Sequence, residues 1–228
     1  MSNSELVEHP LEGLLQLRNE PVQARSTARL AQLLDAAAAI IDEIGYERLT
    51  TAMVAERAGA SIGTVYRYFP DRIALLQALA ARNLERVLGT VVDEVLNPQY
   101  ENWVDALSAG FAHFVDAYRN EPGFRGIRLG DVLDLRPAAN ERTYNSFVAD
   151  SLLAALVSRF DIDDSAENRF AFEAAIEVSD ALATRAFARD RNGDQRFLDM
   201  GRDTVYRMLA DRFGGVPNPP VASPAASP

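Results

Sequence analysis

The sequence predicts an all-α protein in two parts, an N-terminal three-helix unit with a helix-turn-helix and a larger C-terminal helical domain. Between the two ends of the chain, apolar residues recur at spacings of three and four, which is the period of amphipathic helices. No convincing run of alternating β-branched residues indicates a strand. Glycine and proline separate several of the periodic segments, so we expect distinct helices joined by turns.

The first helix is expected over residues 27–44, followed by a short second helix over residues 51–58. Gly45 can end the first helix because glycine readily adopts the left-handed conformation found at helix ends. Thr50 can cap the second helix, and Gly59 breaks it. The first helix carries a single apolar stripe, formed by Leu30, Leu33, Leu34, Ala37, Ile40, Ile41 and Ile44.

A third helix is expected over residues 62–69, with Ser61 as its N-cap. Pro70 and Asp71 end this helix and cap a long fourth helix that reaches towards Leu96. Two short helices joined by a glycine turn are typical of a helix-turn-helix.

The remaining helices belong to the C-terminal domain, and the last two should form an antiparallel pair. Their expected ranges are 101–119, 123–134, 138–159, 165–190 and 194–213. We expect residues 1–20 to form a poorly ordered extension. Residues 214–228 are expected to form a disordered tail, because proline, alanine and serine dominate there and bury little apolar surface. The two domains are expected at residues 21–72 and 73–213.

Composition excludes several classes of chemistry. All 23 basic residues are arginine, so lysine Schiff bases and phosphate-loop lysines are excluded. The chain has no cysteine, which removes disulfides, thiolate nucleophiles and iron–sulfur ligands. The two histidines are far apart and no Glu-x-x-His motif occurs, which disfavours a metal site, although a site built from carboxylates alone stays open. We expect no catalytic residues, no cofactor and no metal.

The charge of the chain is unevenly distributed. The formal net charge is −10, yet residues 21–92 sum to +1 and residues 93–228 to −8. The acidic excess therefore lies in the C-terminal part, and the N-terminal helices are near neutral. No stretch approaches the roughly 18 uncharged apolar residues of a membrane span, and the first residues lack a basic leader region. We expect a cytoplasmic protein with no membrane partner.

The third helix has two chemically different sides on a helical wheel. One side holds Ile62, Val65 and Phe69, with Tyr66 at its edge, and is expected to pack on the first two helices. The opposite side carries Gly63, Thr64, Arg67 and Tyr68. Arginine can bind guanine bidentately, and hydroxyl groups can reach bases or phosphates, so this side suits nucleic acid.

The stretch GASIGTVYRYFPDR, residues 59–72, with its surroundings over about residues 24–80, closely resembles the DNA-binding domain of the tetracycline-repressor (TetR) family. The resemblance implies base-facing roles for Thr64 and Arg67. It implies phosphate contacts for Thr51, Tyr66, Tyr68 and Arg72, the last standing where the family usually has lysine. The free amides of the helices that begin near Thr51 and Ser61 are expected to bind phosphates as well. Gly63 reads no base but lets the backbone approach DNA.

The family resemblance also implies a C-terminal domain that binds a small-molecule effector and forms a homodimer on palindromic operator DNA, most often as a repressor. Candidate residues for an effector pocket are Trp103, Phe111, His113, Phe114, Phe124, Tyr144 and Phe147. Candidate residues for the dimer interface are Ala174, Val178, Ala181, Leu182, Phe197, Gly201, Val205 and Met208. Each of these side chains fits ordinary intrachain packing as well.

Alternative interpretations remain open. Tyr66, Tyr68 and Phe69 also fit the core of a small helical bundle, and Thr64 and Arg67 fit a solvated face. Residues 59–63 match G-x-S-x-G, the nucleophile elbow of α/β-hydrolases, but a helix rather than a strand is expected before the serine. The alternative functions are a ligand-binding helical protein or a small helical enzyme with a degenerate DNA-binding domain.

Overall fold

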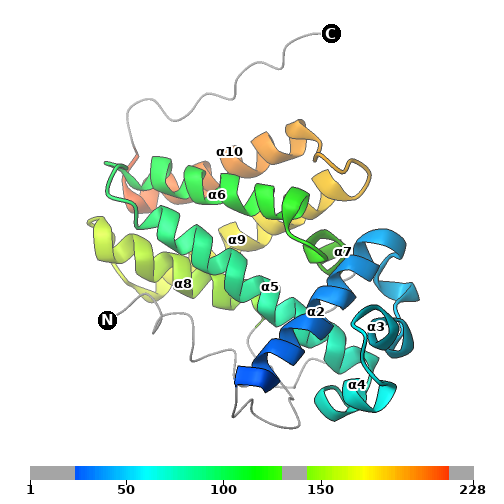
Figure 1. Ribbon diagram of the computed structural model, residues 1–228. Helices are drawn as coiled ribbons and strands as arrows, with labels where there is room; N and C mark the ends of the chain where they lie inside the picture. The colour runs from blue at the N-terminus through cyan, green and yellow to red at the C-terminus, as the bar shows by residue number, and fades with distance from the viewer. Residues whose placement is uncertain (1–23, 130–142, 216–228) are drawn as a thin grey trace. The chain divides into compact units, whose positions relative to one another are not determined.

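The computed structural model describes residues 24–129 and 143–215, and this part of the chain contains helices and no strands. The predicted all-α fold is confirmed. The elements, labelled as in Figure 1, are α2 (Ala24–Ile44), the 3₁₀ helix η1 (Tyr46–Arg48), α3 (Thr51–Arg57), α4 (Ile62–Tyr68), α5 (Arg72–Val95), α6 (Trp103–Asn120), α7 (Phe124–Leu129), α8 (Tyr144–Arg159), α9 (Ala166–Phe187) and α10 (Gln195–Phe213).

The described residues divide into two compact units. The first consists of residues 24–87 and 116–129, and the second of residues 88–115 and 143–215. The division falls inside α5 and inside α6, whereas the sequence places the boundary after residue 72, where α5 begins. Further expectations fall on residues 1–20, 134–142 and the tail beyond Gly215. These residues lie outside the part of the chain that the structure describes.

The three expected helix caps are present in the first unit. The hydroxyl of Thr50 accepts a hydrogen bond from Met53 N at 3.2 Å, and that of Ser61 accepts one from Thr64 N at 3.1 Å. The Asp71 carboxylate accepts one from Ala74 N at 2.9 Å, at the start of α5. Each cap satisfies an amide that the helix itself leaves unpaired.

A continuous apolar core joins α2, α3, α4 and the first half of α5. It includes Leu33, Val54, Val65, Phe69 and Leu76, each at most 1% exposed. Two boundaries in this unit differ from the sequence prediction. The helix α2 begins three residues before residue 27, and η1, which was not predicted, follows Gly45. The φ of Gly45 is positive as expected, at 86°, but its ψ of 156° is not that of a left-handed helix.

The short helix α7 packs closely on α2 through two glycines. A Cβ atom on Gly123 would lie 3.0 Å from Ala38 Cα, and one on Gly126 would lie 2.5 Å from Ile41 Cγ2. Ile127 then completes the contact by entering the apolar core. The absence of side chains at the two glycines therefore sets the distance between α7 and α2. The predicted helix over 123–134 is confirmed as far as Leu129, where the described residues end.

In the second unit, α9 packs most extensively on α10, as expected of the last two helices (Figure 1). The turn between them contains Gly193 at a φ of 83°. The predicted helix over 138–159 begins only at Tyr144, because the Thr143 hydroxyl accepts a hydrogen bond from Ser146 N and caps α8 there. The predicted helix over 165–190 ends at Phe187.

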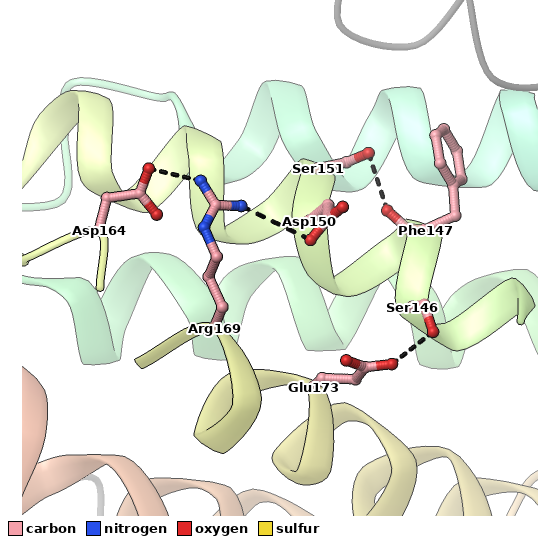
Figure 2. A network of polar contacts seen from close by, with 7 residues as sticks. All are labelled: Ser146, Phe147, Asp150, Ser151, Asp164, Arg169 and Glu173. Atoms are coloured by element: carbon pink, nitrogen blue, oxygen red, sulfur yellow. Dashed lines mark hydrogen bonds and ion pairs between the residues drawn. The ribbon is translucent and has the colours of Figure 1, made fainter. Parts of the chain in front are cut away.

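Polar side chains cross between α8 and α9, as Figure 2 shows. The Ser146 hydroxyl, on a residue that is 8% exposed, donates to the Glu173 carboxylate. Arg169 of α9 binds Asp164 at 2.5 Å and lies 3.8 Å from the carboxylate of Asp150 on α8. The contacts of Ser146 with Glu173 and of Arg169 with Asp150 join residues that are far apart in the sequence and fix how α8 and α9 face each other.

Candidate nucleic-acid interface

Hydrogen bonds within the first turn of α4 stabilise the start of this helix. The Ser61 and Thr64 hydroxyls lie 2.9 Å apart, within hydrogen-bonding distance, while the Ser61 hydroxyl also accepts from the backbone of Thr64. The cap therefore orients Thr64 and defines where α4 begins. The same geometry argues against a nucleophile elbow, because α3 and a turn precede Ser61 where that motif requires a strand.

Ser61, Gly63, Tyr66 and Arg67 are exposed on α4, and Thr64 is half-buried. The predicted placement of Gly63 and Arg67 on the open side of the helix is confirmed. Tyr66 is 47% exposed, so only part of its ring packs. Nothing but the Ser61 hydroxyl, at 3.8 Å, lies near the position of a Cβ on Gly63, which leaves bare backbone on this face.

Two placements on the helical wheel were wrong. Ile62 was expected in the core but is 42% exposed, because it is the first residue of α4 and the packing of this helix begins one turn later, at Val65. Tyr68 was expected on the open side but is only 8% exposed. It follows Val65 by three residues and precedes Phe69, so it shares their buried side.

Tyr68 links α4 to α2 and supports Arg67. Its hydroxyl lies 3.1 Å from Ser26 Oγ. Its ring lies beneath the guanidinium of Arg67, with 5.3 Å from Arg67 Cζ to the ring centroid. A cation over an aromatic face is attracted to it, which restricts the directions in which Arg67 extends.

The other expected phosphate-contacting residues also make contacts inside the unit. Thr51 is 9% exposed, and its hydroxyl donates to the Tyr66 hydroxyl at 3.4 Å. Arg72 donates from Nη2 to the carbonyl oxygen of Tyr46 at 2.5 Å, which joins the start of α5 to η1. Their contacts with DNA stay predictions.

Charge pairing distinguishes two arginines of the helix-turn-helix. Arg57 of α3 binds Glu43 of α2 bidentately, with both N–O distances at 2.6 Å. The hydrogen bonds from Arg57 hold the pKa of the Glu43 carboxyl below its usual value of 4.5. Arg57 is thus engaged in joining α2 to α3, whereas Arg67 stands over an aromatic ring on the exposed side of α4.

Comparisons with known proteins agree with this geometry. The family model described as "Bacterial regulatory proteins, tetR family" matches residues 33–79, and "Tetracyclin repressor-like, C-terminal domain" matches residues 101–213. A solved TetR-family transcriptional regulator from Streptomyces coelicolor is 30% identical, with 81% of this chain and 97% of that chain covered and a TM-score of 0.67. The chain belongs to the TetR family.

Several curated relatives of this TetR-family chain are named transcriptional repressors and match it over different lengths. The HTH-type transcriptional repressor KstR of Rhodococcus jostii is 44% identical over 59 residues, which are 26% of this chain and 28% of the relative. The HTH-type transcriptional repressor Rv1474c of Mycobacterium tuberculosis is 28% identical over 160 residues, 58% of this chain and 83% of the relative. Against the KstR proteins, the chain spans between 27% and 29% of the relative's length.

The candidate effector-pocket residues of this TetR-family chain come from both units. Phe124 belongs to the first unit, where its ring packs edge-to-face against that of Tyr118, with 5.2 Å between the ring centroids. Trp103, in the second unit, is 4% exposed and donates from Nε1 to the carbonyl of Gly214 at 2.8 Å, so α10 covers it. Phe111 and Phe114 are partly buried neighbours, with centroids 6.4 Å apart.

The other three candidates differ in exposure. His113 is exposed on α6, with Nε2 3.4 Å from the Glu94 carboxylate. Its role in an effector pocket stays a prediction. Phe147 is buried on α8, and Tyr144 is half-buried at its start.

The candidate dimer residues also differ in exposure. Gly201 and Val205 are buried within the chain, and a Cβ on Gly201 would lie 3.6 Å from Leu182 Cβ. Ala181 is exposed, while the remaining five, Ala174, Val178, Leu182, Phe197 and Met208, are half-buried. Sequence reasoning missed Phe170 on α9 and Met200 on α10, which are 75% and 53% exposed. The four-residue spacing from Phe170 through Ala174 to Val178 could have revealed the first.

Two further classes of site are absent from residues 24–129 and 143–215. None of the helices there combines the length and the apolar character needed to cross a membrane. Within the same residues, no group of three or more acidic, histidine or cysteine side chains is arranged to hold a metal ion.

Proposed function

We propose that this TetR-family chain is a one-component transcriptional repressor of the cytoplasm, which binds a palindromic operator as a homodimer and is released from DNA by a small-molecule effector. The observation that carries the proposal is the outer face of α4. There an arginine supported by an aromatic ring, a capped threonine and bare glycine backbone are displayed together.

These groups suit the major groove of DNA. Arg67 can donate two parallel hydrogen bonds to guanine, and the exposed ring and hydroxyl of Tyr66 can reach the sugar-phosphate backbone. The apolar core behind Val65 and the cap at Ser61 hold α4 in place, which reduces the ordering cost of binding. The near-neutral charge of residues 21–92 means that affinity depends on these placed groups more than on a general attraction to polyanions.

A dimer follows from the small size of the reading helix. The helix α4 has seven residues and reaches few base pairs, whereas two copies about 34–36 Å apart read successive major grooves of a palindrome. Phe170 and Met200 are large apolar side chains exposed on α9 and α10. We assign them to the interface with the second copy, together with the exposed Ala181.

For the effector, the partly buried aromatic residues Phe111 and Phe114 and the buried Phe147 support an apolar ligand in the second unit. A ligand releases DNA only if it binds the DNA-free conformation more tightly than the DNA-bound one. A ligand screen against the full chain would identify the chemical class of the effector.

Fluorescence anisotropy with duplexes from the region upstream of the gene tests the proposal at a stated salt concentration. The variant Arg67→Ala removes one base contact from each of the two half-sites of the operator. Because one bidentate base contact is worth about 1–3 kcal/mol, DNA affinity should fall by at least about 30-fold. Arg119→Ala is the matched control, because Arg119 is an exposed arginine paired with Asp116 on α6. If Arg67→Ala binds every duplex as tightly as the Arg119→Ala variant does, the proposal is wrong.

A further inference from the structure

Ile62 is a large aliphatic side chain that lies outside the apolar core and is partly exposed. It is 42% exposed, and it belongs neither to the core of the first unit nor to the partly buried residues packed against that core. The cap at the start of α4 is made by Ser61 and the backbone of Thr64, so Ile62 has no part in it. Neither packing nor capping therefore accounts for an isoleucine at this position.

Ile62 shares its side of α4 with a second exposed apolar group. Tyr66, one turn further along, is 47% exposed, and residues four apart lie on the same side of a helix. Within the described residues, the exposed large hydrophobic side chains are these two, Phe170 and Met200. Two of them thus fall on one helix of seven residues.

The surface beside Ile62 is open to close approach by a flat partner. Gly63, the next residue, has only the Ser61 hydroxyl near its missing Cβ, at 3.8 Å. The Thr64 hydroxyl lies 2.9 Å from that same hydroxyl and is held within the cap. The first turn of α4 therefore presents an aliphatic side chain and bare backbone, while its two hydroxyls bind each other.

An aliphatic side chain can recognise one feature of the major groove. Base edges there present hydrogen-bond donors and acceptors, except that thymine also presents a 5-methyl group. We propose that Ile62 is a specificity-determining residue that contacts the 5-methyl group of one thymine in each half-site of the operator. The inference rests on the proposed function, since it requires that α4 enters the major groove.

The test uses the full chain and thymine analogues. Duplexes are first selected by the protein from a random library, and each thymine of the selected duplex is then replaced by deoxyuridine, which lacks only the methyl group. Wild type should lose about fourfold in affinity per half-site at one symmetry-related pair of thymines, the loss expected for one buried methyl-sized group. All other replacements should have smaller effects.

The variant Ile62→Ala should bind the thymine and the deoxyuridine duplexes equally, whereas Ile62→Val, which retains a branched side chain, should keep most of the difference. Both should remain folded, because the residue lies outside the core. If the protein selects duplexes but no deoxyuridine replacement weakens binding, or if Ile62→Ala keeps the full loss, this inference is wrong and the proposed function stands. If the protein selects no duplex at all, both are wrong.

Discussion

Local caps define the helices of the helix-turn-helix in the first unit, whereas polar contacts between distant residues join α8 to α9 in the second. In the first unit, α2, α3, α4 and the start of α5 share an apolar core, and Thr50, Ser61 and Asp71 each cap the helix that follows. Longer-range contacts, such as that of Arg57 with Glu43, also occur there. In the second unit, α8 and α9 are joined by polar side chains from distant positions, such as Ser146 with Glu173 and Asn145 with Glu177.

These two kinds of contact explain why the helix-turn-helix could be predicted in detail from the sequence and the contact between α8 and α9 could not. Caps, glycine turns and apolar stripes are local patterns, and they place α4 with its outer face towards solvent. A contact between Ser146 and Glu173 leaves no local pattern, because each residue alone fits a solvated helix face. Four predictions test the contrast, beginning with the largest effect.

Phe69→Ala should lower the free energy of unfolding by about 3–5 kcal/mol, as expected for removing a buried aromatic ring from a packed core. Phe69 is 1% exposed at the end of α4. Urea unfolding followed by circular dichroism gives the value. Ile62→Ala, on the exposed side of the same helix, should change it by less than about 0.5 kcal/mol. Equal losses in the two variants would contradict the assigned core.

Gly126→Ala should destabilise the chain by about 1–3 kcal/mol, because the added methyl group overpacks the contact between α7 and α2. Its Cβ would lie 2.5 Å from Ile41 Cγ2, and Ile41 is 3% exposed. Gly89→Ala in α5 is the control, since nothing lies within 4 Å of the added atom. There the better helix propensity of alanine should raise stability by up to about 1 kcal/mol. If the thermal unfolding midpoints of Gly126→Ala and Gly89→Ala both moved in the same direction from wild type, the assigned close contact at Gly126 would be contradicted.

Ser146→Ala should cost about 1 kcal/mol, the usual net contribution of one hydrogen bond, although serine is an ordinary surface residue by sequence. The variant removes the donor to Glu173 that Figure 2 shows between α8 and α9. A double-mutant cycle with Glu173→Ala, measured by urea unfolding, should give a coupling of at least about 0.5 kcal/mol. A coupling of zero would contradict a stabilising role for the contact between Ser146 and Glu173.

The smallest effect is expected at Asp194, which caps α10. Hydrogen bonds from Arg196 lower the pKa of this half-buried carboxyl from 3.8 to about 2. Because the folded pKa is depressed, the stabilisation is present above about pH 4 and is lost as the pH falls towards 2. The difference in melting temperature between wild type and Asp194→Asn should therefore narrow over that interval. In Arg196→Ala, the midpoint of the carboxyl titration followed by NMR should rise towards 3.8; an unchanged midpoint would contradict the assigned cause.

Most of the helix-turn-helix could be predicted from the sequence because its signals are short-range. Thr50, Ser61 and Asp71 cap the helices that follow them, as predicted. The helical-wheel prediction was wrong for Ile62 and Tyr68. A wheel gives the direction of a side chain around the helix, but it does not show at which residue along the helix axis the core ends. The exposure of Phe170 likewise depends on which neighbours α9 acquires.

The sequence by itself determined the all-α class, the helix-turn-helix and the family, because periodicity, caps and glycine turns act within a few residues of one another. Only the tertiary structure decided that Tyr68 supports Arg67 from the buried side, that Ile62 faces solvent, and that two glycines bring α7 against α2. These properties depend on residues that are distant in the chain. Burial is set by the final packing of the helices, which no single segment specifies.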